Sequence, residues 1–132
     1  MPSCCPNNIP PASSLYVPKN VGVYESGDFK AKTAIIYIHD IFGWTLQAKE
    51  VADLLAERIN TDNSDNNVRI IAPDIFQGKP WPVEKFPEDI NNISQDIYDW
   101  ILGFDYETVV KPIILKEIEK LRYQGVTTFH AV

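Results

Sequence analysis

The sequence has little cysteine, and all of it stands in one place. Its only two cysteines, Cys4 and Cys5, are adjacent in a chain of 132 residues. Adjacent cysteines cannot staple distant parts of a fold, so a disulfide-rich secreted domain is excluded. With no histidine or third cysteine close by in sequence, the pair is a poor metal site, and a solvated tail explains it better than metal binding or acylation does.

Long apolar runs and clusters of basic residues are also missing. The longest apolar run, residues 34–38, is far too short to cross a bilayer, and no basic segment followed by an apolar stretch opens the chain. The 12 Lys and Arg are scattered and the formal net charge is -6, so no surface should neutralise a row of phosphates. We therefore expect a cytoplasmic protein that binds neither nucleic acid nor membrane.

The common cofactor and nucleophile motifs are absent as well. The sequence contains no Gly-x-x-x-x-Gly-Lys for a phosphate loop and no Gly-x-Gly for a dinucleotide. It also lacks the Gly-x-Ser-x-Gly of a serine hydrolase, so we expect no metal, no organic cofactor and no nucleophile. The histidines, His39 and His130, could each act as a base, although a hydrogen-bonded structural histidine is the commoner case at a strand end.

What is present predicts one α/β domain behind a leader. Residues 1–19 are rich in proline and small polar residues, a composition that favours a flexible segment, and residues 20–132 form the domain. Runs of apolar residues with little alternation indicate strands covered on both faces, and a shorter edge strand precedes them. The strands are expected at residues 21–24, 33–39, 68–72 and 126–132.

Helices are expected between and after these strands, because apolar residues recur there at helical spacing. The expected helices cover residues 47–60, 87–104 and 108–124, the last ending at Gly125. Strands alternating with helices predict a mostly parallel sheet with helices on both faces. The connection at residues 60–67 is a surface loop with only a faint likeness to a calcium loop. Residues 75–82 are either a site-lining loop or a packed connector.

Acidic residues follow two of the predicted strands, at Asp40 and Asp74. Ligands in open α/β sheets bind beyond the carboxyl ends of the strands, so both positions are candidates for a site. Asp40 could instead cap the following helix, and Asp74 could be ordinary turn chemistry after a proline. We favour the site for Asp40 and the turn for Asp74.

Residues 34–43 (AIIYIHDIFG), 51–56 (VADLLA) and 72–78 (APDIFQG) together resemble the dienelactone hydrolase family. The resemblance covers roughly residues 24–132 and implies the amino-terminal part of an α/β-hydrolase fold. Members cleave esters and lactones with a Cys-His-Asp triad, whose cysteine stands on a Gly-x-Cys-x-Gly turn after a central strand. Here that strand matches residues 126–132, and the 132 residues include neither that turn nor the other triad members.

The resemblance can still be carried onto individual positions. It implies that Asp40 is the acidic residue that governs ionisation of the nucleophile, and that the backbone N–H of Ile41 is an oxyanion-hole donor. The neighbouring aromatics Phe42, Trp44 and Phe76 are expected to contact a small ester or lactone substrate.

Two functions follow from these patterns. The first is a dienelactone hydrolase-like hydrolase, inactive as these 132 residues because the nucleophile is missing. The alternative is a non-catalytic α/β module that binds a small molecule or a partner, with Trp44, Phe76 and Trp81 lining its pocket. In either case the strand at residues 126–132 lacks a next neighbour, which predicts self-association through that edge.

Overall fold

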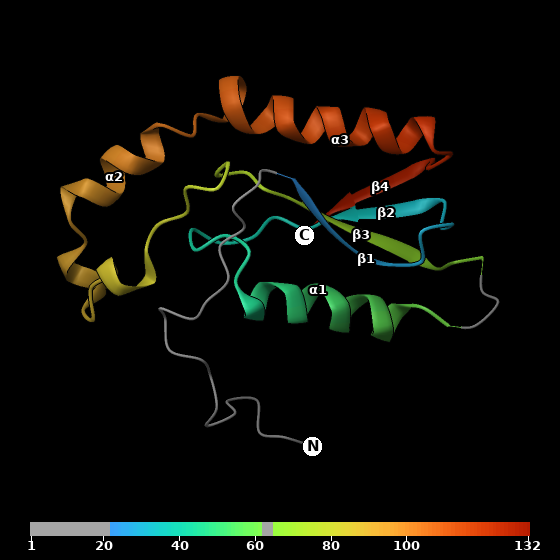
Figure 1. Cartoon of the computed structure of the whole chain (residues 1–132), viewed down its shortest axis with the longest axis horizontal. Helices are drawn as coiled ribbons and strands as arrows, with labels where there is room; N and C mark the ends of the chain where they lie inside the picture. The colour runs from blue at the N-terminus through green and yellow to red at the C-terminus, as the bar shows by residue number, and fades with distance from the viewer. Residues whose placement is uncertain (1–21, 62–64) are drawn as a thin grey trace, which may run out of the picture.

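The computed structural model describes residues 22–61 and 65–132. The predicted leader at residues 1–19 and the centre of the loop at residues 60–67 lie outside the described residues. Within them the chain forms a four-stranded sheet with helices on both faces (Figure 1), which confirms the α/β character. The strand order is β1-β3-β2-β4, with β1 at Val23–Gly27, β2 at Thr33–Ile36, β3 at Val68–Pro73 and β4 at Thr128–Ala131.

The sheet is mixed, which corrects the expectation of a mostly parallel one. β2 pairs in parallel with β3 and β4, with Ile35 opposite Ile70 and His130, whereas β1 runs antiparallel to β3, with Glu25 opposite Ile71. The reason lies in the connections. A parallel return needs a crossover of a dozen or more residues, and only the short segment 28–32 separates β1 from β2, so the chain can only reverse direction there.

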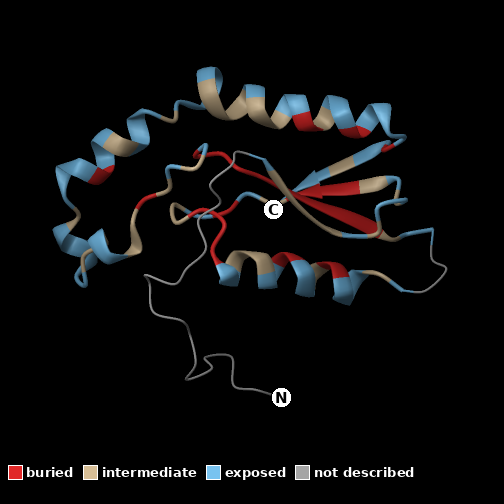
Figure 2. Ribbon diagram, in the orientation of Figure 1, coloured by how far each residue is buried: buried red, intermediate tan, exposed pale blue. Residues whose placement is uncertain are grey.

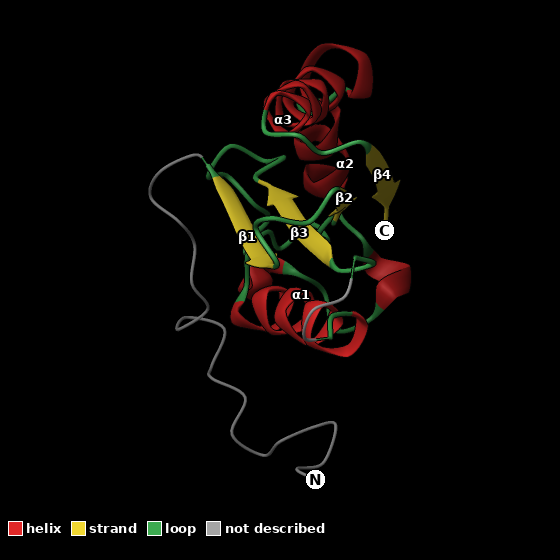
Figure 3. Ribbon diagram, turned by 90° about the vertical axis from the view of Figure 1, so that its right-hand side faces the viewer, coloured by secondary structure: helices red, strands yellow, loops and turns green. Residues whose placement is uncertain are grey.

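Two helices enclose the sheet. Helix α1 (Leu46–Ile59) covers one face and α3 (Lys111–Tyr123) the other (Figures 1 and 3). The core is therefore divided into two layers. The strands β2 and β3 between them are largely buried (Figure 2). The α3 layer consists of Ala34, Ile36, Ile71, Leu121 and Val126, and the α1 layer of Ile35, Ala52, Ala56, Val68 and Ile70.

The predicted helix at residues 87–104 is shorter than expected. Only a 3-10 turn, η3 (Ile90–Asn92), and helix α2 (Gln95–Leu102) form there, after a first 3-10 turn, η2 (Val83–Lys85). The Asp89 carboxylate accepts a hydrogen bond from the Asn91 N–H at 2.9 Å. Such local side-chain bonds compete with helical ones, and Ile93 and Ser94 are non-helical.

Helix α3 begins later than predicted but ends as expected. A π-helical turn, η4 (Tyr106–Val110), precedes it, and Pro112 lies in its first turn, where a missing N–H costs little. Gly125 follows with a φ of +97°, and the Val126 N–H donates to the Leu121 carbonyl at 3.0 Å. This left-handed glycine turns the chain into β4.

Candidate functional site

Two loops meet at the carboxyl ends of β2 and β3. The ladder continues past β2, because the Ile38 N–H donates to the Val132 carbonyl at 2.7 Å, and the first loop starts at His39. The second loop follows Pro73. The Trp81 N–H donates to the Ile41 carbonyl at 2.8 Å, so the two loops are joined directly.

Asp40 organises the first loop. Its carboxylate is exposed, and Oδ1 accepts a hydrogen bond from the Phe42 N–H at 2.9 Å. Its carbonyl accepts one from the Gly43 N–H at 3.1 Å, with Gly43 at a φ of +74°. Helix α1 is capped by Thr45, whose Oγ1 accepts from the Ala48 N–H at 3.1 Å. Helix capping is therefore the wrong explanation for Asp40, which closes its own turn.

The Ile41 N–H is the donor that this turn leaves unused. The N–H groups of Phe42 and Gly43 are both satisfied by Asp40. Across residues 22–61 and 65–132, no acceptor takes a hydrogen bond from the Ile41 N–H. The arrangement can therefore offer one backbone donor beside one exposed carboxylate.

The charge of Asp40 reaches a neighbouring side chain. Burial raises the pKa of Tyr37 above its ordinary value, and the Asp40 carboxylate raises it further. Tyr37 packs against the α1 layer of the core. The negative charge of Asp40 therefore affects the Tyr37 hydroxyl group.

His39 is 5% exposed and both of its ring nitrogens are engaged. Nδ1 lies 2.9 Å from the Asp40 carbonyl oxygen, and Nε2 lies 3.4 Å from the Ile75 backbone nitrogen. This geometry supports the structural alternative for His39 rather than a base. His130 lies exposed on β4. The sequence offered no sign of the contact between His39 and Ile75, since the two residues are 36 positions apart.

The predicted substrate-contacting aromatics have different surroundings. Phe42 is half-buried, with its ring centroid 5.6 Å from that of Phe86. Trp44 and Phe76 are buried, at 7% and 6% exposure. The first loop thus presents one accessible aromatic ring, while the other two residues lie within the protein interior.

Phe76 belongs to an aromatic cluster that sequence reasoning missed. Its ring centroid lies 4.8 Å from that of Trp100 and 4.9 Å from that of Phe104, and Trp81 packs against Trp100 at 5.6 Å. The segment at residues 75–82 is therefore a packed connector at these positions. The signal that could have found the cluster is the presence of several large aromatics in and after this loop.

Two indole groups at this end of the sheet carry unsatisfied donors. The Nε1–H groups of Trp44 and Trp81 are buried and have no acceptor within the described part of the chain. Buried donors are normally satisfied.

Asp74 behaves as the turn residue that the sequence indicated. It is buried, and its Oδ2 accepts from the Gly78 N–H at 2.7 Å. Its carbonyl accepts from the Gln77 N–H at 3.3 Å. Its carboxylate therefore serves the second loop rather than an open site.

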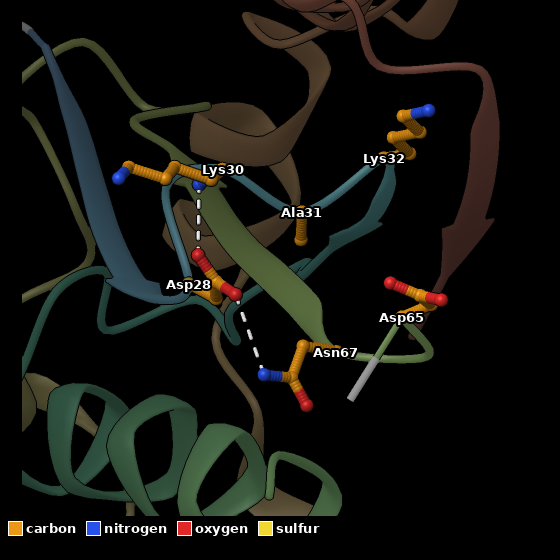
Figure 4. A pocket seen from close by; sticks show the side chains of 6 residues that line it. All are labelled: Asp28, Lys30, Ala31, Lys32, Asp65 and Asn67. Carbon is orange, nitrogen blue, oxygen red and sulfur yellow. Dashed lines mark hydrogen bonds between the residues drawn. The ribbon is translucent and has the colours of Figure 1, made fainter. Parts of the chain in front are cut away.

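A hollow of about 480 Å³ lies at the opposite end of the strands. It is formed by segments that precede β2 and β3 (Figure 4), and its lining residues are Asp28, Lys30, Ala31, Lys32, Asp65 and Asn67. Asp28 accepts from the Lys30 N–H at 2.9 Å and from the Asn67 amide at 3.3 Å. The lysine side chains point away from one another (Figure 4). Since ligands of such sheets bind at the carboxyl ends, we place the candidate site at the Asp40 turn.

The described residues offer neither a metal cluster nor a membrane-spanning helix. Within residues 22–61 and 65–132, no group of three or more His, Cys, Asp or Glu side chains could hold a metal ion. In the same part of the chain, none of the helices has both the length and the apolar character needed to span a membrane.

Comparison with known proteins gives one informative similarity. The chain is 32% identical over 96 residues to Hydrolase pyvD from Aspergillus violaceofuscus (strain CBS 115571), across 72% of this chain. The matched region is 33% of that protein, so the chain spans about one third of the length of this curated relative. No protein-family profile matches the chain, and no solved structure matches it. The chain is thus similar to a fungal hydrolase over most of its length.

Proposed function

We propose that this chain is the amino-terminal part of a dienelactone hydrolase-like enzyme that cleaves a small carboxylic ester or lactone. In this proposal the first loop supplies the electrostatic part of the active site. The Ile41 N–H is one oxyanion-hole donor, and Asp40 is the acid that tunes the nucleophile. Phe42, the accessible ring of the first loop, contacts the substrate, and the buried Trp44 and Phe76 pack behind it.

The observation that carries the proposal is the unused Ile41 N–H. The turn around it is fixed by three hydrogen bonds: Asp40 accepts from the N–H groups of Phe42 and Gly43, and the Ile41 carbonyl accepts from the Trp81 N–H. A preorganised donor needs no reorganisation during reaction, and removing one such donor costs roughly 2.7–4 kcal/mol of barrier. The similarity to Hydrolase pyvD supports the reaction class.

The environment of the Asp40 carboxylate supports its proposed role as the acid that tunes the nucleophile. It is exposed, and one oxygen is held by the Phe42 N–H, which orients the group. A negative charge close to a cysteine opposes loss of the thiol proton. A carboxylate beside the nucleophile would therefore raise the pKa of its thiol.

One donor and one carboxylate do not complete acyl transfer, because a nucleophile and its base are also needed. None of the 132 residues provides the Gly-x-Cys-x-Gly turn. We therefore expect the purified chain to hydrolyse short-chain p-nitrophenyl esters no faster than the uncatalysed background. Robust turnover that is lost in Asp40→Asn would contradict the assignment of the nucleophile to another segment.

The direct test is to read the coding sequence downstream of the Val132 codon. A Gly-x-Cys-x-Gly turn there, in any frame or after an intron, supports the proposal, and unrelated sequence throughout contradicts it. In the extended product, Ile41→Pro removes the donor, whereas Ile41→Val keeps it. We expect kcat to fall about 10²- to 10³-fold in the first variant and to stay near wild type in the second. Thermal melting of both variants controls for folding.

The binding-module alternative has less support from the geometry. It placed Trp44, Phe76 and Trp81 in a pocket, but all three side chains are buried by packing. A soluble, cooperatively melting monomer that binds a small molecule at this end of the sheet would favour the alternative.

A further inference from the structure

The peptide group between Asp40 and Ile41 is held by its carbonyl. The Asp40 oxygen lies 2.9 Å from His39 Nδ1 and 3.1 Å from the Gly43 nitrogen. A trans peptide is planar, with its N–H opposite its C=O, and the described residues contain no cis peptide bond. Anchoring this carbonyl therefore sets the direction in which the Ile41 N–H points.

The position of the His39 proton follows from the other ring nitrogen. A backbone N–H can only donate, so Nε2 must accept from the Ile75 N–H. The neutral ring then carries its proton on Nδ1, which donates it to the Asp40 carbonyl. The ring is 5% exposed and packs against Phe76, with 5.3 Å between centroids, so the second loop holds it in place.

We propose that His39 is the positioning residue of the Ile41 N–H. It ties the loop after β2 to the loop after β3 and fixes the Asp40–Ile41 peptide from its carbonyl side. Donation to that carbonyl also polarises the peptide, which makes its N–H a stronger donor. The use of this N–H as an oxyanion donor rests on the proposed function, whereas the tautomer and the peptide orientation do not.

The first test is the tautomer of His39 in the full 132-residue chain labelled with nitrogen-15. A long-range proton–nitrogen NMR correlation, recorded where the rings are neutral, should show Nδ1 protonated and Nε2 unprotonated. His130, exposed on β4, is the internal reference and should show the mixed tautomers of a solvated ring. Protonation of His39 on Nε2, or a mixture like that of His130, would overturn the proposal.

The second test separates positioning from general packing. His39→Asn keeps a donor close to the place of Nδ1, and His39→Leu removes both ring nitrogens. We expect the Ile41 amide proton to move upfield in His39→Leu and to stay close to wild type in His39→Asn. The Ile75 amide should move in both, because neither variant has an acceptor at the place of Nε2. An Ile41 resonance unchanged in His39→Leu would refute the positioning role.

Folding and function can be told apart in the same samples. The amides of Ile70 and Ile71, in the buried strand β3, should keep their shifts if the sheet is intact. If His39→Leu does not fold, the tautomer of His39 in the wild type and the Ile41 shift in His39→Asn still test the positioning role. In the extended product, hydrolysis with unchanged kcat in His39→Leu would refute the positioning role alone. No hydrolysis despite the expected tautomer and shifts would refute the proposed function alone.

Discussion

The two edges of the sheet are built differently. β1 is fastened to the rest of the molecule by side chains as well as by its ladder with β3. Glu25 accepts from the buried Arg69 at 3.1 Å, and the Tyr24 hydroxyl donates to Asp53 of α1 at 2.7 Å. β4 pairs only with β2 among the described strands, three of its four residues are exposed, and no Asp, Glu, Lys or Arg occurs in residues 126–132.

This difference bears on whether each edge strand can pair with a further strand. Charged and tightly turned edges resist further pairing, whereas an apolar edge with unpaired backbone groups invites another strand. β1 ends in Gly27, which is turned sharply back against the β3 backbone. Among the described strands, β1 is therefore the protected edge and β4 the unprotected one.

The strongest test of this contrast uses the glycine beside each edge. A Cβ at Gly27, where φ is +92°, would lie 2.5 Å from the Val68 carbonyl oxygen. Gly125 has a φ of +97° but nothing within 4 Å of its Cβ position. We expect Gly27→Ala to lower the free energy of unfolding by about 3 kcal/mol and Gly125→Ala by about 1 kcal/mol. Urea unfolding measures both, and equal losses would contradict the tight closure of β1.

The next effect is the ion pair that fastens β1. The Arg69 side chain is 7% exposed and that of Glu25 is 24% exposed. Glu25→Ala therefore leaves a buried guanidinium whose one remaining side-chain acceptor among the described residues is Gln124. We expect a loss of about 2 kcal/mol. The matched control is Glu107→Ala, which removes the exposed pair with Lys111 and should cost less than about 0.5 kcal/mol. Similar losses of unfolding free energy in the two variants would show that burial does not strengthen the Arg69–Glu25 pair.

A third test addresses the unprotected edge, β4. We propose that the chain self-associates through residues 126–132. Ala131→Lys would place a charge on the exposed strand and should weaken dimerisation about tenfold, or about 1.4 kcal/mol. Tyr123→Lys, at a residue exposed at the end of α3, adds the same charge away from the edge and should leave association unchanged. Sedimentation at several concentrations measures this, and a wild-type monomer throughout would refute the proposal.

The smallest expected effect is the pH dependence of the tie between β1 and α1. Burial, followed by the hydrogen bond and the charge of Asp53, raises the pKa of Tyr24 from 10.0 to about 12. Because the pKa of Tyr24 is higher in the folded state than in the unfolded state, the protonated hydroxyl stabilises the fold. This contribution to the free energy of unfolding is complete below pH 10 and is lost as the pH rises towards 12. Tyr24→Phe should remove this dependence, as measured by unfolding between those two values. Identical pH profiles for wild type and variant would contradict it.

The secondary structure was predictable where burial on both faces leaves a plain pattern. Continuous apolar runs located β2 and β3, and helical spacing located α1 within about one residue at each end. The predicted helix at residues 87–104 was wrong in length. There, the Asp89 carboxylate accepts hydrogen bonds from the backbone and side-chain amides of Asn91, and these bonds compete with the helix. The spacing of apolar residues does not indicate such bonds.

The place of Asp40 in the fold was predictable, but the hydrogen bonds of its turn were not. The pattern of an apolar strand followed by an acidic residue pointed to Asp40, which lies at the carboxyl end of β2 as expected. The hydrogen bond that Asp40 accepts from the Phe42 N–H depends on the shape of the turn, and so does the lack of an acceptor for the Ile41 N–H among the described residues. That shape depends on contacts with the second loop.

The order of strands and helices, the burial of β2 and β3, and the acidic turn after β2 could be predicted from the amino-acid sequence, because they depend on neighbouring residues and their spacing. The three-dimensional fold was needed for the packing of Phe76 and Trp81 with Trp100 and for the hydrogen bond between His39 and Ile75. These features join segments that are distant in the chain. Which distant groups meet depends on how the two core layers close around the sheet.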